Sequence, residues 1–126
     1  MSDANKKKIL IVEDDRALQN ALLEMLGQEG YELIPAVDGE EGLAKAASEK
    51  PDLILLDIIL PKKDGYEVLA DIKKNPEIKD IPVLILTNLE EISDVQKAIS
   101  LGAKTFMVKS DFSLKDVLEK VKENLK

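Results

Sequence analysis

Residues 9–15 read ILIVEDD, so four apolar residues lead directly into three acids. A short apolar run rich in β-branched residues is typical of a strand that is buried on both faces, as the strands of a parallel sheet are. The same arrangement returns further along the chain, where apolar runs end in Asp57, Thr87 and Lys109. The sequence therefore predicts several buried parallel strands that each end in a polar residue.

Segments with the apolar spacing of amphipathic helices separate these strands. The predicted strands cover residues 9–12, 31–37, 53–56, 83–86 and 105–108, and the predicted helices cover residues 18–26, 40–49, 66–74, 92–99 and 114–125. Pro35 indicates that the second strand lies at an edge of the sheet, because proline cannot donate to the strand ladder. Five strand–helix units in strict alternation predict an α/β fold with a parallel sheet, helices on both faces and right-handed crossovers.

The ends of two helical segments carry further signals. Asp15 and Ser113 stand just before the first and last segments and are predicted N-caps. Gly27 and Gly30 are predicted to end the first helix.

Composition limits the chemistry of the chain. Its 126 residues fit a single domain, residues 1–126, and we expect no output domain. The absence of His and Cys excludes structural zinc of the Cys/His type, iron–sulfur clusters, haem ligation and Cys/His nucleophiles. A formal charge of −7 argues against sequence-independent DNA binding. No apolar stretch reaches the roughly 18 residues of a membrane helix or the length of a signal-peptide core, so we expect a cytoplasmic protein.

The polar residues at the strand ends should meet, because ligands of open parallel sheets bind at the carboxyl ends of the strands. Glu13, Asp14 and Asp57 would bring three negative charges together there, and Lys109 would return one positive charge. Two carboxylates about 4 Å apart repel by roughly 4 kcal/mol at an effective dielectric near 20, so such a site takes up protons or binds a cation. An all-oxygen ligand set favours Mg²⁺. With a hydroxyl from Thr87 nearby, the set predicts phosphoryl transfer to Asp57.

The whole chain resembles the receiver domain of bacterial two-component response regulators, of the single-domain kind that is similar to chemotaxis regulators. Four segments carry the resemblance in the family's order and at its spacings: residues 9–15, residues 57–65 (DIILPKKDG), Thr87, and residues 106–109 (FMVK). The resemblance implies a flavodoxin-like, doubly wound sheet with the strand order 2-1-3-4-5. It also implies a signalling phospho-acceptor that catalyses only its own phosphorylation and dephosphorylation.

The resemblance assigns roles to the acidic residues. Asp57 would accept a phosphoryl group from the phosphohistidine of a sensor histidine kinase or of a phosphotransfer protein. Asp14, Asp57 and the backbone carbonyl of Ile59 would ligate Mg²⁺, with Glu13 acting mainly through water.

The resemblance also implies how the signal leaves the site. Thr87 and Lys109 would contact the phosphoryl group, and Phe106 would be an aromatic switch that turns inward as Thr87 moves. The surface formed by the fourth helix, the fifth strand and the fifth helix would then bind a downstream protein or a second copy of the chain. No direct contact with nucleic acid or membrane is expected.

Two other functions match parts of the pattern. A Mg²⁺-dependent phosphatase with an aspartyl nucleophile, on a similar fold, normally has a second carboxylate two residues after the nucleophile, where this chain has Ile59. A nucleotide- or flavin-binding module needs a glycine-rich first turn, whereas the first loop of this chain is acidic.

One position departs from the family's pattern. Ser110 follows Lys109 where receiver domains usually have a proline after a cis peptide bond. A cis bond before a residue other than proline costs about 2.5–4 kcal/mol, so we expect the Lys109–Ser110 bond to be trans.

Overall fold

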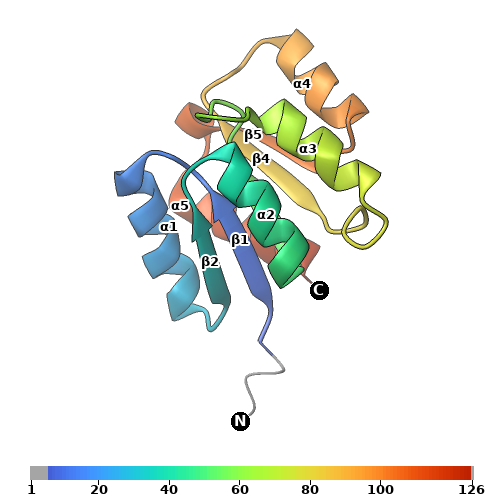
Figure 1. Cartoon of the computed structure of the whole chain (residues 1–126). Helices are drawn as coiled ribbons and strands as arrows, with labels where there is room; N and C mark the ends of the chain where they lie inside the picture. The colour runs from blue at the N-terminus through green and yellow to red at the C-terminus, as the bar shows by residue number, and fades with distance from the viewer. Residues whose placement is uncertain (1–5, 126) are drawn as a thin grey trace.

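Five parallel strands form one sheet in the order β2-β1-β3-β4-β5, in a computed structural model that describes residues 6–125 (Figure 1). The strands are β1 (Lys8–Val12), β2 (Glu32–Ala36), β3 (Leu53–Leu56), β4 (Val83–Thr87) and β5 (Thr105–Val108). The helices are α1 (Arg16–Gln28), α2 (Gly39–Glu49), α3 (Gly65–Lys74), α4 (Ile92–Ser100) and α5 (Leu114–Asn124). The predicted alternation and the flavodoxin-like strand order are confirmed, and Pro35 lies on the edge strand β2 as expected.

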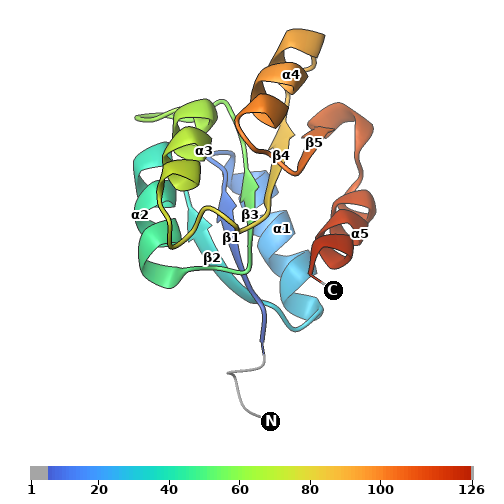
Figure 2. The same cartoon turned by 90° about the vertical axis from the view of Figure 1, so that its right-hand side faces the viewer.

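The helices cover the two faces of the sheet in separate layers. Helices α1 and α5 lie on one face, and α2, α3 and α4 lie on the other (Figures 1 and 2). Alternate residues of each strand therefore enter different apolar clusters, so that Leu10 packs on the α2–α4 side and Ile11 packs on the α1/α5 side. None of the helices within residues 6–125 combines the length and the apolar character needed to cross a lipid bilayer.

The central strands are the most deeply buried part of the molecule. Every side chain of β3 and every side chain of β1 after Lys8 is at most 2 % exposed. This burial explains why continuous apolar runs, rather than alternating ones, encode these strands. It also means that residues just after β1 and β3, such as Glu13 and Asp57, emerge from the rigid middle of the sheet.

The predicted N-caps are confirmed, whereas one predicted helix end is wrong. The Asp15 side chain accepts a hydrogen bond from the backbone N–H of Leu18, and Ser113 forms a capping box at the start of α5. Helix α1 continues through Gly27 to Gln28, and the turn occurs at Gly30, whose φ is +91°. A glycine inside a helix costs only about 1 kcal/mol relative to alanine, which the packing of neighbouring apolar residues such as Leu26 outweighs.

The loop that follows β3 is held by two glycines that permit close backbone approach. The N–H of Gly65 donates to the carbonyl oxygen of Ile58 at 2.8 Å, and the N–H of Gly39 donates to the carbonyl oxygen of Pro61 at 3.2 Å. A Cβ atom at Gly65 would overlap the carbonyl oxygen of Asp57 and lie 2.6 Å from the Cα of Ile58. Glycine at position 65 is therefore required for α3 to begin directly against the end of β3.

Candidate functional site

One ammonium group joins two carboxylates at the carboxyl end of the sheet. The Nζ atom of Lys109 lies 2.8 Å from Oε1 of Glu13 and 2.8 Å from Oδ2 of Asp57. Glu13 and Asp57 are only 2 % and 4 % exposed. Charge-assisted bonds of this length are strong where water is largely excluded, so residues that follow β1, β3 and β5 are linked at one point.

Backbone groups fix the orientation of both carboxylates. The second oxygen of Glu13, Oε2, accepts from the N–H of Asp15 at 3.0 Å. The second oxygen of Asp57, Oδ1, accepts from the N–H of Ile59 at 3.2 Å. Each carboxylate therefore uses one oxygen for the Lys109 ammonium and the other for the loop that follows its own strand.

Burial and the neighbouring charges shift the pKa values of both Glu13 and Lys109. Burial raises the pKa of Glu13, and the negative charge of Asp57 adds to the rise, while the hydrogen bonds from Lys109 and from the Asp15 N–H oppose it. Burial alone would lower the pKa of Lys109, but its bonds to Asp57 and Glu13 outweigh that effect and the pKa is raised. The raised pKa of Lys109 favours the protonated ammonium, whereas burial makes the ionised form of Glu13 less favourable than it is in water.

The acidic cluster has the composition of a site for a hard cation. One carboxylate oxygen from each of Glu13, Asp14 and Asp57 lies within 4.8 Å of the others. Asp14 is exposed whereas the other two are buried, so the cluster opens to solvent on one side. Three carboxylates and the Lys109 ammonium leave a formal charge of −2, which a divalent ion would neutralise. All-oxygen ligands of this kind fit Mg²⁺ or a similar ion.

Thr87 and Phe106 lie on the neighbouring strands. Thr87 ends β4 and is fully buried, and its hydroxyl lies 3.5 Å from the backbone nitrogen of Leu89, from which it accepts a hydrogen bond. Phe106 pairs with Ile85 in the sheet and packs, partly buried, against the α2–α4 side of the core. Because side chains alternate along a strand, Thr87 and Phe106 belong to the same face of adjacent strands.

The loops that follow β3 and β5 complete the site. The side chain of Ile59 is 53 % exposed, while its N–H holds Asp57. A 3₁₀ turn over Lys109–Asp111 follows β5 and carries Lys109 over the acids. The expected trans Lys109–Ser110 bond is confirmed, since residues 6–125 contain no cis peptide bond.

Sequence reasoning missed Gln19, which lies beneath the acidic loop. Its side-chain Nε2 lies within hydrogen-bond distance of the carbonyl oxygens of Ile11, Glu13 and Ala36, at 3.1, 3.3 and 3.0 Å. A signal was present in the sequence, because Gln19 falls at helical spacing with Leu22 and so places an amide on the buried face of α1.

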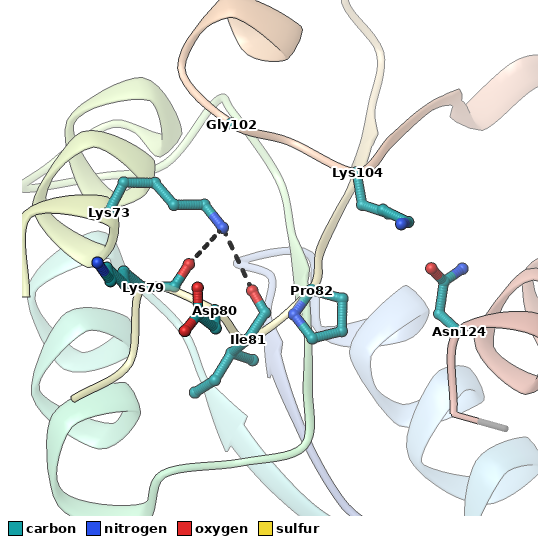
Figure 3. Close-up of a pocket in the computed structure, with 8 residues that line it drawn as sticks. All are labelled: Lys73, Lys79, Asp80, Ile81, Pro82, Gly102, Lys104 and Asn124. Carbon is teal, nitrogen blue, oxygen red and sulfur yellow. Dashed lines mark hydrogen bonds between the residues drawn. The ribbon is translucent and has the colours of Figure 1, made fainter. Parts of the chain in front are cut away.

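A cavity of about 360 Å³ lies at the other end of the sheet, before the first residues of β4 and β5 (Figure 3). Figure 3 shows the Lys73 ammonium bonded to the carbonyl oxygens of Lys79 and Ile81, at 2.9 and 3.4 Å. Burial lowers the pKa of Lys73, and the charge of Asp80 partly opposes this. Lys73 is thus held by the cavity wall, and none of the acids that meet at Lys109 lines this space.

Replacing Glu13 by glutamine should stabilise the protein at neutral pH in the absence of divalent cations. The pKa of Glu13 is raised in the folded state above its ordinary value of 4.5. Its contribution to stability is therefore present below about pH 4.5 and is lost as the pH rises through the raised pKa. We expect the free energy of unfolding of Glu13→Gln to exceed that of the parent at pH 7, and the difference to shrink towards pH 4.5. Urea denaturation in a chelator measures both values.

Glu41→Gln is the control with the opposite sign. The hydrogen bond from the Val37 N–H lowers the pKa of Glu41, so this group stabilises the fold above its ordinary pKa and the contribution is lost as the pH falls. Glu41→Gln should therefore be less stable than the parent at pH 7. A loss of stability for Glu13→Gln at pH 7 would show that the ion pair with Lys109 outweighs the burial of the carboxylate.

Comparison with known proteins adds an independent line of evidence. A family model described as the response regulator receiver domain matches residues 9–122. The alkaline phosphatase synthesis transcriptional regulatory protein PhoP of Bacillus subtilis is 42 % identical over 120 residues, which cover 95 % of this chain and 49 % of PhoP. The chain spans about half the length of the curated relatives it matches.

Solved structures agree over nearly the full length. A CheY-like response regulator receiver domain protein from Methanospirillum hungatei superposes with a TM-score of 0.89 at 34 % identity, covering 96 % of this chain and 94 % of that one. The Mn²⁺-bound form of response regulator Rcp1 superposes with a TM-score of 0.79 at 40 % identity, covering 93 % of this chain and 90 % of that one.

Proposed function

Because this chain belongs to the response regulator receiver family, and so is a receiver domain of two-component signalling, we propose that Asp57 is its phosphoryl acceptor. The observation that carries the proposal is the sharing of one ammonium by two buried carboxylates, Glu13 and Asp57, beside the exposed Asp14. The proposed donor is the phosphohistidine of a histidine kinase or of a phosphotransfer protein, as in two-component signalling.

In the proposed reaction an Asp57 oxygen attacks the phosphorus of a phosphohistidine. The new P–O bond forms as the P–N bond breaks, and the leaving imidazole nitrogen keeps the electron pair and takes a proton from solvent. The backbone N–H of Ile59 and the Lys109 ammonium hold the carboxylate in one orientation before the attack. Such preorganisation lowers the barrier because the groups need not reorient as charge moves.

We propose Mg²⁺ as the cofactor, held by Asp14, Asp57 and the Ile59 carbonyl, with Glu13 in support. When bound, a divalent ion of this kind balances the charge of the phosphoryl oxygens. The oxygen-only cluster of Glu13, Asp14 and Asp57 supports this assignment, as does the printed description of the related Rcp1 as Mn²⁺-bound.

We propose that phosphorylation changes the positions of the Thr87, Lys109 and Phe106 side chains. The modified Asp57 carries about −1.5 to −2 charges and new acceptor oxygens, towards which the Thr87 hydroxyl and the Lys109 ammonium would move. Since Phe106 lies on the same face as Thr87, we propose that it turns inward as Thr87 leaves its place.

The output surface is formed by α4, β5 and α5. On α4, Ile92 and Ile99 are 75 % and 47 % exposed and lie seven residues apart, so they share one helix face. We propose that this surface binds a downstream protein or a second copy of the chain, and that the protein acts in the cytoplasm. The phosphatase alternative is not supported, because the position two residues after Asp57 carries the apolar, exposed Ile59.

The test is a metal-dependent labelling experiment. The protein is incubated with a small phosphodonor such as acetyl phosphate, once with Mg²⁺ and once with excess chelator, and intact mass is measured over time. We expect one phosphoryl adduct with Mg²⁺ and a reaction at least about a hundredfold slower in chelator, because such an ion supplies several kcal/mol of charge stabilisation and about 1.4 kcal/mol is a factor of ten in rate. Steady release of phosphate without an adduct would instead support the phosphatase, and equal labelling in chelator would remove Mg²⁺ from the proposal.

A further inference from the structure

The side chain of Gln19 ties together the ends of two strands. Gln19 is 4 % exposed on α1, and its amide NH₂ group faces the carbonyl oxygens of Ile11 and Glu13 at the end of β1. The same nitrogen lies 3.0 Å from the carbonyl oxygen of Ala36, the last residue of β2. The Ala36 carbonyl oxygen also accepts from the backbone N–H of Glu13, so the two strand ends form one connected network.

The amide can occupy this place in only one orientation. An amide flip would direct its oxygen at three carbonyl oxygens, none of which can donate a hydrogen bond. In the orientation observed, the Oε1 atom of Gln19 is buried and has no hydrogen-bond partner among residues 6–125. An unpaired buried acceptor is unfavourable, and an apolar side chain of the same size would avoid it. The same apolar side chain would, however, remove both N–H donors from the carbonyl oxygens of Ile11, Glu13 and Ala36, so the hydrogen bonds to the two strand ends are what favour glutamine at this position.

The network leads directly to the acids of the site. Gln19 contacts the carbonyl oxygen of Glu13 directly. It also contacts the Ala36 carbonyl oxygen, which accepts a hydrogen bond from the backbone N–H of Glu13. From there the Glu13 side chain contacts the N–H of Asp15 through Oε2 and the Lys109 ammonium through Oε1. The amide is thus two contacts away from the group that holds the acceptor carboxylate.

We propose that Gln19 is a positioning residue, which fixes the acidic loop 13–15 in the geometry that binds the divalent cation. The identity of the cation rests on the function proposed above, whereas the effect of Gln19 on the loop does not. Residues that orient metal ligands through hydrogen bonds typically change metal affinity by 10–100-fold when they are replaced.

The test compares Gln19→Met with Leu26→Val. Methionine keeps the length and volume of glutamine but removes both N–H donors. Leu26 is fully buried on the same helix, at the end away from the acids, so Leu26→Val perturbs packing without touching the loop. Three quantities are measured for each variant: thermal stability, Mg²⁺ affinity by calorimetry without phosphodonor, and hydrogen exchange of the Asp15 amide in chelator.

For Gln19→Met we expect Mg²⁺ affinity to fall by about tenfold or more and the Asp15 amide to exchange about tenfold faster. Leu26→Val should leave both quantities within about twofold of the parent, even if its stability falls further. If Gln19→Met does not fold, the same measurements are made on Gln19→Leu. Unchanged exchange and affinity in a folded Gln19 variant would overturn the proposal. If the parent protein does not bind Mg²⁺, the proposed function is wrong, and the Asp15 exchange rate alone then tests Gln19.

Discussion

Asp57→Asn should abolish covalent phosphorylation while leaving the fold intact. The amide is far less nucleophilic than a carboxylate, so no adduct should form with Mg²⁺ and a small phosphodonor, whatever the incubation time. The fold should survive because asparagine has nearly the shape of aspartate and the Lys109 ammonium retains Glu13 at 2.8 Å. Intact-mass spectrometry and thermal denaturation measure the two parts of this prediction.

The chain offers a matched control for this substitution. Asp52 lies just before β3, at the end of the sheet away from Asp57, and its Oδ2 accepts from the backbone N–H of Lys8 at 2.7 Å. Asp52→Asn makes the same chemical change at the opposite end of the same strand and should leave labelling unchanged. An adduct on Asp57→Asn would mean that another residue, such as Asp14, is the acceptor, and peptide mapping would identify it.

Gly65→Ala should cost roughly 3 kcal/mol of unfolding free energy and slow phosphorylation as well. A Cβ atom there would overlap the Asp57 carbonyl oxygen and crowd the Ile58 Cα, and both of these buried residues directly follow β3. Overpacking against backbone that cannot move typically costs about 1–3 kcal/mol or more. Because the backbone of Asp57 is the part displaced, the Oδ1 contact with the Ile59 N–H should weaken too.

Gly27→Ala is the control, with an effect of opposite sign. Gly27 is helical, and its Cβ would meet only the Leu33 side chain at 3.7 Å, which is an ordinary contact. We expect a gain of about 0.5–1 kcal/mol, since alanine loses less conformational freedom than glycine in a helix. Urea denaturation of both variants measures the two changes, and a neutral result for Gly65→Ala would show that the end of β3 yields more easily than its burial indicates.

Most of the fold could be predicted because the central strands are buried on both faces. Their apolar runs, such as residues 9–12, have no solvent-facing side, so the sequence shows each strand directly. Helix ends were harder, because they depend on packing partners that no local pattern shows. Gly27 matches a helix stop locally, yet α1 continues to Gln28 against the sheet.

The candidate site could be predicted as a set of residue types but not as a set of contacts. The strand ends pointed to Glu13, Asp57 and Lys109, because parallel strands end at one edge of a sheet. The contact of the Lys109 ammonium with both carboxylates depends on the 3₁₀ turn after β5. This turn has no clear signal in the sequence. Gln19 was missed because its importance comes from Ala36, a residue 17 positions away in the chain.

The division of the core into two layers has a consequence for how this protein can change over time. The α1/α5 cluster and the α2–α4 cluster share no buried side chain, because the sheet lies between them. Substitutions on opposite faces should therefore combine almost additively in their effect on stability. The site draws Gln19 from the α1/α5 layer and Phe106 from the α2–α4 layer, so core substitutions near Gln19 and core substitutions near Phe106 can accumulate with little effect on one another.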